Sequence, residues 1–185
     1  ITFFVSCSKD PLDKAPLSSF TEDVVWNDEN LIETFVNNTY RILPTGFHYS
    51  MTNSLSTLTD ENNARANSAA IAINAGNITP DALGALDYWN DPQRGFYKVI
   101  TKTNIFFSKI DKSPINAEVK SRMSGEMKFL RAFSYFRLIS FYGGVPLITK
   151  PFGLNDDFQV SRNSYAECMD FVIKELDEAA NSLPL

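Results

Sequence analysis

The sequence at residues 125–136 is GEMKFLRAFSYF, and FYGGVPLI follows at residues 141–148. In and around the first segment, apolar residues recur at every third or fourth position, which predicts a helix from a cap at Asn116 to Tyr142. This helix is apolar nearly all round, as expected for a central helix that other helices cover on both sides. Its narrow polar stripe consists of Ser124, Lys128, Arg131, Ser134 and Arg137.

Within this helix, the sequence also predicts which residues pack and which residues pair. We expect Leu130, Phe133 and Phe136 to lie in the core, because their spacing is that of helix packing. Glu126 and Arg131 lie five positions apart near one face, and we expect each to contact neighbouring helices rather than the other. Buried charges need such partners. A contact with a partner protein is the alternative for these two charges.

The glycine pair Gly143-Gly144 is expected to end the central helix, because a helix cap in the left-handed conformation suits glycine. Val145-Pro146 then continues as extended chain. The pair is not a phosphate cradle, since the sequence holds neither a P-loop nor a dinucleotide-binding fingerprint.

Helices are also expected on either side of the central one. The first begins at an Asp28 cap and ends at Pro44-Thr45-Gly46, and the second runs from about Asp91 to Ile110. The last begins with the capping box Ser164-x-x-Glu167 and is closed by Pro184. The expected apolar positions are Leu31, Ile32, Phe35, Val36, Tyr40 and Leu43 in the first; Phe96, Val99, Ile100, Phe106, Phe107 and Ile110 in the second; and Tyr165, Cys168, Val172, Leu176, Ala179 and Leu183 in the last.

The predicted fold class is therefore all-α, with stacked antiparallel helix pairs in a tetratricopeptide-like layer, although no clean 34-residue repeat is present. The helical domain is expected to span residues 28–185, with residues 45–90 forming one long loop excursion. Residues 8–27 contain Pro11 and Pro16 and no sustained periodicity, so an extended tether is expected there.

Composition excludes several classes of function. The chain has 185 residues, of which 44% are hydrophobic, and a formal net charge of −5, which speaks against nucleic-acid binding. One histidine and two cysteines leave little for a metal site, a nucleophile pair or a disulfide framework, and no cofactor is indicated. The adjacent carboxylates Asp60-Glu61 and Asp156-Asp157 are typical of solvated loops rather than of a glycosidase, so no enzymatic activity is expected.

The amino-terminal seven residues, ITFFVSC, end an apolar run with a small residue and a cysteine. This is the pattern that bacterial lipoprotein signal peptidase cuts, so residues 1–7 are interpreted as a truncated signal with Cys7 as the lipid anchor. Multiple acyl chains would hold the protein stably on a membrane. The alternative is a frayed apolar end or the start of a strand. Elsewhere no run of about 20 apolar residues occurs, so a lipid anchor is the only membrane attachment expected.

Residues 125–136 and 141–148 together resemble the signature of the SusD/RagB-type outer-membrane lipoproteins. Further matches in family order are Trp89, Tyr97-x-x-Ile100-x-x-x-Asn104 and Arg162-x-Ser164. The signature positions, which we interpret as structural, are Gly125, Glu126, Phe129, Leu130, Arg131, Tyr142, Gly143, Gly144 and Pro146.

The resemblance implies an α-helical, tetratricopeptide-containing lipoprotein on the outer-membrane surface of Bacteroidetes-type bacteria. Such proteins capture glycans, or in some members peptides, and pass them to the barrel of a TonB-dependent transporter. Family members are generally much longer, so part of the ligand site would lie outside this sequence. The rival interpretation is a helical-repeat adaptor that binds only protein, and a third is a small secreted helical domain without an anchor.

Sugar capture requires an aromatic ring to stack on the pyranose face, with amides and charged groups to pair its hydroxyls. The predicted long loop supplies these residue types. The candidate ligand-binding residues are Tyr49, Asp60, Asn62, Asn63, Arg65 and Trp89. Trp89 has packing as its alternative role, and Asp60 has a turn cap or an oxygen site for Ca²⁺, although the stretch lacks EF-hand spacing.

Overall fold

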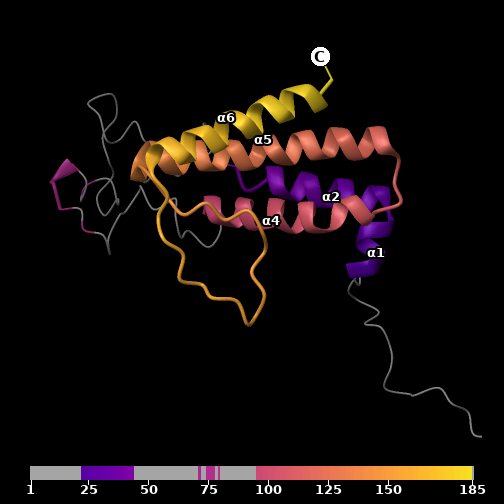
Figure 1. Ribbon diagram of the computed structural model, residues 1–185, viewed down its shortest axis with the longest axis horizontal. Helices are drawn as coiled ribbons and strands as arrows, with labels where there is room; N and C mark the ends of the chain where they lie inside the picture. The colour runs from indigo at the N-terminus through magenta and orange to yellow at the C-terminus, as the bar shows by residue number, and fades with distance from the viewer. Residues whose placement is uncertain (1–21, 44–70, 72–73, 78, 80–94, 185) are drawn as a thin grey trace, which may run out of the picture.

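The computed structural model describes residues 22–43, 71, 74–77, 79 and 95–184. Its elements are the helices α1 (Glu22–Asn27), α2 (Glu29–Tyr40), α4 (Phe96–Lys109), η3 (Ile110–Lys112), α5 (Ala117–Tyr142) and α6 (Tyr165–Ser182). Figure 1 shows α5 between α6 on one side and α2 with α4 on the other, and α5 packs most extensively against α6 and α4. The prediction of an all-α fold with adjacent helix pairs is confirmed.

The caps that the sequence predicts are present. The Asp28 carboxylate accepts from the Asn30 and Leu31 N–H groups at 2.8 and 3.1 Å, and Asn116 accepts from Glu118 N–H at 2.8 Å. Gly143 ends α5 as predicted, but its φ of 70° and ψ of −141° are not those of the expected left-handed helical cap; this conformation strains any residue with a side chain. α6 begins with the complete capping box of Ser164 and Glu167.

The centre of the polar stripe predicted for α5 is buried. Arg131 and Ser134 are buried, whereas Phe129 and Phe136 are 40% and 47% exposed and Phe133 is half-buried. Arg131 can be buried because α6 and α4 supply polar partners, and the Ser134 hydroxyl donates to the Leu130 carbonyl at 2.7 Å. Of the predicted core residues in this signature, Leu130 is fully buried, while the prediction for Phe136 is wrong.

The extended tether predicted for residues 8–27 is also wrong at its carboxyl end, because Glu22–Asn27 form α1. Trp26 is the reason for this helix. Its ring contacts Phe35 and Phe106, with centroids 5.2 and 6.1 Å apart, and the side chain is only 8% exposed. A buried tryptophan contributes enough apolar area to fix a short helix that periodicity alone does not reveal.

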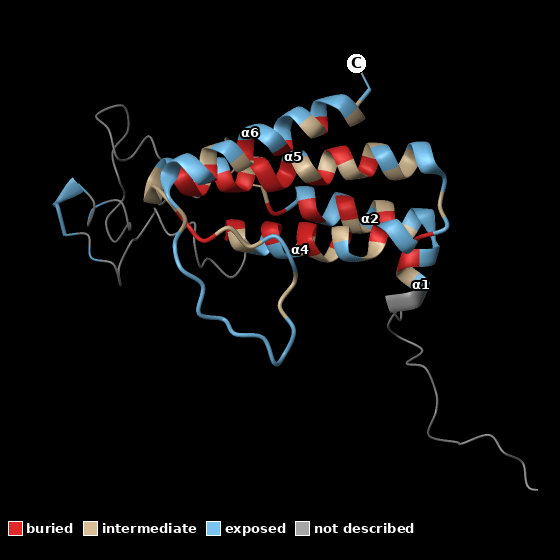
Figure 2. Cartoon of the chain, in the orientation of Figure 1, coloured by how far each residue is buried: buried red, intermediate tan, exposed pale blue. Residues whose placement is uncertain are grey.

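The core consists of two clusters along α5. One lies where α1, α2, α4 and the first half of α5 meet, and it contains Val36, Phe106, Met123 and Leu130. The other lies between α4, α6 and the second half of α5, and Tyr135 and Cys168 belong to it. Figure 2 shows the buried side of α5 facing the other helices and the exposed outer side of α6.

Several predicted apolar positions lie nearer the surface than expected. Tyr40, Tyr165 and Leu176 are each more than one-third exposed, whereas Cys168, Val172 and Ala179 are buried as predicted. For the second predicted helix, Gly95 is the cap, and residues 91–94 lie outside the described residues. Among the helices of the described ranges, none combines the length and the apolar character needed to cross a bilayer.

Candidate functional site

The structure divides the predicted site residues into two groups. Cys7 and all six candidate ligand residues lie outside the described residues; the latter are Tyr49, Asp60, Asn62, Asn63, Arg65 and Trp89. The signature residues lie inside, on α5 and the chain that follows it. The site that the described residues define is therefore the set of contacts that the signature makes.

Arg131 is the centre of this set. Its guanidinium donates from Nε and Nη2 to the two carboxylate oxygens of Glu175 on α6, both at 2.8 Å, and from Nη1 to Asn104 Oδ1 on α4 at 3.0 Å. The Phe107 ring lies under it, 4.4 Å from Cζ to the ring centroid. A buried arginine with this many partners joins α4, α5 and α6 in one arrangement.

Asn104 extends the contacts to the chain after α5. Its side-chain amide donates to the Ile148 carbonyl at 2.8 Å and more weakly to the Lys150 carbonyl at 3.4 Å. We call residues 144–150 the clamped segment, because this extended chain is held mainly by side chains of the surrounding helices. The charge of Arg131 orients Asn104, and Asn104 fixes the clamped segment.

Two tyrosines hold the same segment. Tyr97 on α4 donates to the Pro146 carbonyl at 2.8 Å, while the Tyr135 hydroxyl on α5 donates to Ile148 O at 3.0 Å and accepts from Ile148 N–H at 2.7 Å. Burial raises the pKa of both phenols well above their usual range. Both hydroxyls therefore stay protonated and remain donors across the physiological pH range.

The start of α6 closes the clamp from the other side. Asn163 accepts from Leu147 N–H at 3.0 Å and donates its own N–H to the Val145 carbonyl at 3.1 Å. Arg162 donates to the carbonyls of Gly144, at 2.8 Å, and Tyr142. The backbones approach so closely that a Cβ on Gly144 would lie 2.0 Å from the Asn163 carbonyl oxygen, which explains the second glycine of the pair.

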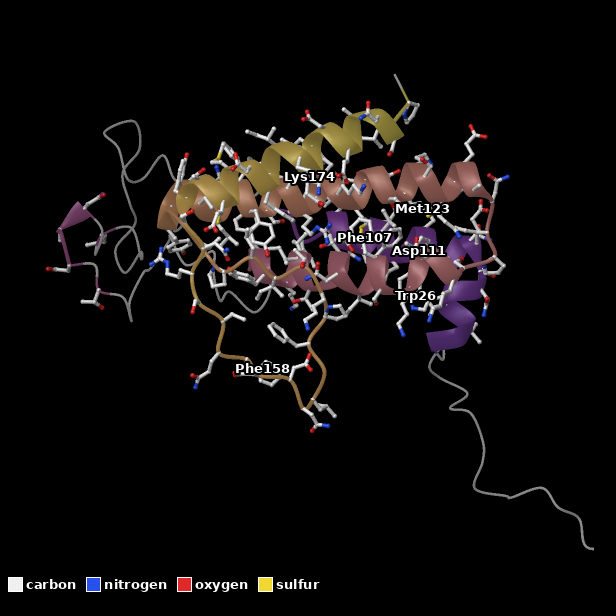
Figure 3. The ribbon with its side chains drawn as sticks, viewed as in Figure 1. Trp26, Phe107, Asp111, Met123, Phe158 and Lys174 are labelled. Atoms are coloured by element: carbon white, nitrogen blue, oxygen red, sulfur yellow. The ribbon has the colours of Figure 1, made fainter. Side chains whose placement is uncertain are left out.

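The chain between the two clamped ends forms what we call the projecting loop, residues 151–161. Figure 1 shows it leaving the bundle beside α4 and returning to α6, and Figure 3 places Phe158 on the lower part of the loop, away from the helices. Phe152 and Phe158 contact each other, with ring centroids 5.2 Å apart.

Glu126, the other charged signature residue, belongs to a separate contact nearer the start of α5. Arg122 donates to Glu126 at 2.5 Å and to Glu33 on α2 at 3.2 Å. Burial, followed by the charge of Glu126, raises the pKa of Tyr40 on α2. Glu126 and Arg131 thus each reach a neighbouring helix and do not pair with each other, as predicted.

Beside this contact, an open cavity of about 320 Å³ lies between the start of α5 and the end of α6. Its lining residues are Glu118, Val119, Ser121, Arg122, Ser182, Leu183 and Pro184. No group of three or more potential metal ligands occurs among the described residues. In these ranges, the arrangement positions backbone and side chains rigidly and holds no reactive constellation.

Sequence reasoning found part of this site. Tyr97 and Asn104 stand in the predicted motif, and their separation of seven residues places them on one face of α4. Glu175 and Tyr135 were missed as functional positions. The sequence signal for Glu175 is weak. This residue lies between Val172 and Ala179 on the buried, otherwise apolar face of α6, and one charge at such a position does not by itself indicate a function.

The described residues thus form a helical layer in which the connection between α5 and α6 is held by side chains of α4 and α5 and by the start of α6. The sequence matches, over residues 10–185, the SusD-like family described as "Starch-binding associating with outer membrane". The chain therefore belongs to the SusD-like family.

Individual relatives agree with this assignment. SusD-like protein P38 of Formosa agariphila is 33% identical over 108 residues, which are 58% of this chain and 20% of the relative. The crystal structure of a SusD-like protein from Bacteroides fragilis superposes with a TM-score of 0.74 at 31% identity, covering 92% of this chain and 33% of the other. A SusD-like carbohydrate binding protein from the same species gives 0.70 at 29% identity, covering 86% and 32%.

These findings confirm the resemblance, the tetratricopeptide-like helical fold and, at the level of the family, the prediction of a binding protein rather than an enzyme. The family description also places its members in association with the outer membrane. This chain spans about one third of the length of the solved relatives.

Proposed function

We propose that this chain is part of a surface-exposed outer-membrane lipoprotein that binds glycans, or peptides, and delivers them to a partner TonB-dependent transporter. The match to a starch-binding, outer-membrane family over residues 10–185 carries the proposal. A solved relative described as carbohydrate binding, with 29% identity, supports the glycan as ligand.

The described structure fits capture and delivery rather than turnover. The helices and the clamped segment form a pre-arranged support, tied together by the buried Arg131–Glu175 pair. A binding surface on such a support loses little conformational freedom when a ligand arrives, and affinity benefits from that. The ligand would be bound and passed on without chemical change, through many weak contacts.

For the ligand site, the candidates remain the stacking rings of Tyr49 and Trp89 with the polar groups of Asp60, Asn62, Asn63 and Arg65. A glycan site of this type binds through ring stacking and paired hydroxyls. The rest of the site would come from the remainder of the full-length protein, since this chain covers one third of its solved relatives.

The experiment is isothermal titration of the full-length protein with maltooligosaccharides, other soluble glycans and a peptide mixture. We expect saturable binding to one class, and Trp89→Ala or Tyr49→Ala to weaken it at least about tenfold if the ring stacks on the ligand. Ile173→Ala, on the exposed side of α6, is the control. If the full-length protein binds no glycan and no peptide but does bind another protein, the adaptor interpretation replaces this one.

Attachment to the membrane is proposed through acylation of Cys7. Metabolic labelling with a fatty acid in the native host tests it: the wild-type protein should incorporate label, and Cys7→Ala should not. A Cys7→Ala protein that still incorporates labelled lipid would overturn the anchor. The buried Cys168 makes Cys168→Ala the matched control, since its thiol contacts only Val145 among the described hydrogen bonds.

A further inference from the structure

The projecting loop, residues 151–161, carries apolar side chains that the bundle does not cover. Leu154 is 99% exposed, Phe158 is 61% exposed and Val160 is 44% exposed. Scattered exposed apolar residues are ordinary, but three within seven positions at the tip of one loop form a local patch.

The loop is held in place at both ends. The clamped segment fixes the entry through Tyr97, Tyr135 and Asn104, and Arg162 with Asn163 fixes the exit. Inside the loop, the Asp156 carboxylate accepts from Gly153 N–H at 2.9 Å and the Asp157 carboxylate from Gln159 N–H at 2.8 Å. A loop ordered in this way presents its tip at little entropic cost on binding.

The charge of the loop distinguishes between three surfaces that its apolar tip could contact: a lipid membrane, a second copy of the loop and a partner protein. Asp156 and Asp157 are the only charged residues in the loop, so its net charge is −2. Anionic lipid headgroups would repel such a tip, and two copies of the loop would bring four carboxylates together. A protein surface with an apolar pocket edged by lysine or arginine satisfies both the apolar and the acidic side chains.

We propose that the projecting loop docks into an apolar, basic-rimmed pocket of a partner protein, with Leu154 and Phe158 as the buried anchors and the two aspartates pairing at the rim. The inference rests on the proposed function, which supplies the partner: the transporter barrel. It assigns docking to this loop in addition to the helical layer.

The test measures binding of the full-length protein to its purified transporter in detergent by biolayer interferometry. We expect Leu154→Ser and Phe158→Ser each to raise Kd about tenfold or more, the effect typical of a buried anchor. Val24→Ser is the matched control, because Val24 is 48% exposed on α1. It should leave Kd unchanged.

A double variant tests the charge. Asp156→Lys combined with Asp157→Lys should slow association at low salt, and the difference from wild type should shrink as salt screens the pairing. If the double variant and the wild type associate at equal rates at low salt, the inference that the pocket has a basic rim is overturned.

The outcomes separate this inference from the function on which it rests. If the wild-type protein binds no transporter, delivery fails and the docking loop fails with it. If the wild type binds and the Leu154 and Phe158 variants bind equally well, only the loop inference is overturned. A lower melting temperature of Leu154→Ser in the isolated full-length protein would show that another part of the chain covers this side chain, which is 99% exposed in the structure, and this would also overturn the inference.

Discussion

Arg131 on α5 and Glu175 on α6 form a two-bond ion pair, with both N···O distances at 2.8 Å, while their side chains are only 8% and 7% exposed. Removing these charges from water costs free energy. The pair is tolerated because the guanidinium donates hydrogen bonds to Glu175 and Asn104 and packs on the Phe107 ring. The central helix is therefore positioned by polar contacts on the side that faces its neighbours.

Replacing one member of this pair should destabilise the protein strongly. Glu175→Gln leaves the arginine charge buried without its counter-charge, and we expect a loss of about 3–5 kcal/mol in the free energy of unfolding. The double variant Arg131→Met, Glu175→Leu should recover much of that loss, since both charges are then absent. Urea unfolding followed by circular dichroism measures both. The Lys128–Glu178 pair, whose side chains are 25% and 39% exposed and whose N···O distance is 2.5 Å, is the control, and Lys128→Met should cost about 1 kcal/mol or less. A double variant no more stable than Glu175→Gln would contradict this account.

The two adjacent glycines should respond to alanine for different reasons. At Gly144 the added Cβ would lie 2.0 Å from Asn163 O and 2.9 Å from Ser164 C, so the start of α6 must move. At Gly143 the space is open, but φ is +70°, and we expect backbone strain of about 1–3 kcal/mol. Gly144→Ala should cost at least as much and should also weaken the contacts of the clamped segment. Gly153→Ala, whose nearest atoms are at 3.8 Å, should be close to neutral in thermal unfolding.

Much of the fold follows from local signals in the sequence. Asp28, Asn116 and the Ser164 capping box begin their helices as predicted, because a cap depends on residues within one turn. The apolar period also identifies Leu130 and Cys168 as core residues. These interactions are local, so one sequence is sufficient to predict them.

Contacts between distant residues were harder to predict. The periodicity places Phe136 in the core, but the structure leaves it 47% exposed. The partner of Arg131 could not be named from the sequence, because Glu175 lies 44 positions away and supplies the counter-charge. Trp26 similarly packs against Phe106 of α4, a residue distant in the sequence, as well as against Phe35. The candidate ligand residues of the long loop stay predictions, since they fall outside the described residues.

Tyr135 should make the protein sensitive to alkaline pH. Burial raises its pKa in the folded protein, so the stability that this difference confers is complete below the unfolded value of about 10 and is lost as pH rises above it. Absorbance at 295 nm should show that this phenol and Tyr97 ionise only when the chain unfolds. Tyr135→Phe removes the hydroxyl that pairs with Ile148 and should cost about 1–3 kcal/mol at pH 7, with a smaller fall in stability between pH 9 and 11. An unchanged alkaline fall in Tyr135→Phe would show that this residue does not cause it.

Glu167 should make α6 sensitive to acid. Its carboxylate accepts from Ser164 N–H at 2.8 Å, and this backbone hydrogen bond holds the pKa of Glu167 below its usual range. A carboxylate with a lowered folded pKa contributes stability above the unfolded value, and that contribution is lost as pH falls through the folded value. Glu167→Gln should therefore flatten the acid limb of stability below about pH 4.5, the ordinary value for this group. The measurement is the urea midpoint at pH 7 and pH 3.5.

Ser164→Ala, which removes the cap itself, should cost about 1 kcal/mol at both pH values. Glu29→Gln, a glutamate in the first turn of α2, is the matched control and should leave the acid limb steeper than in Glu167→Gln. Equal acid limbs in the two glutamine variants would contradict the assignment to Glu167.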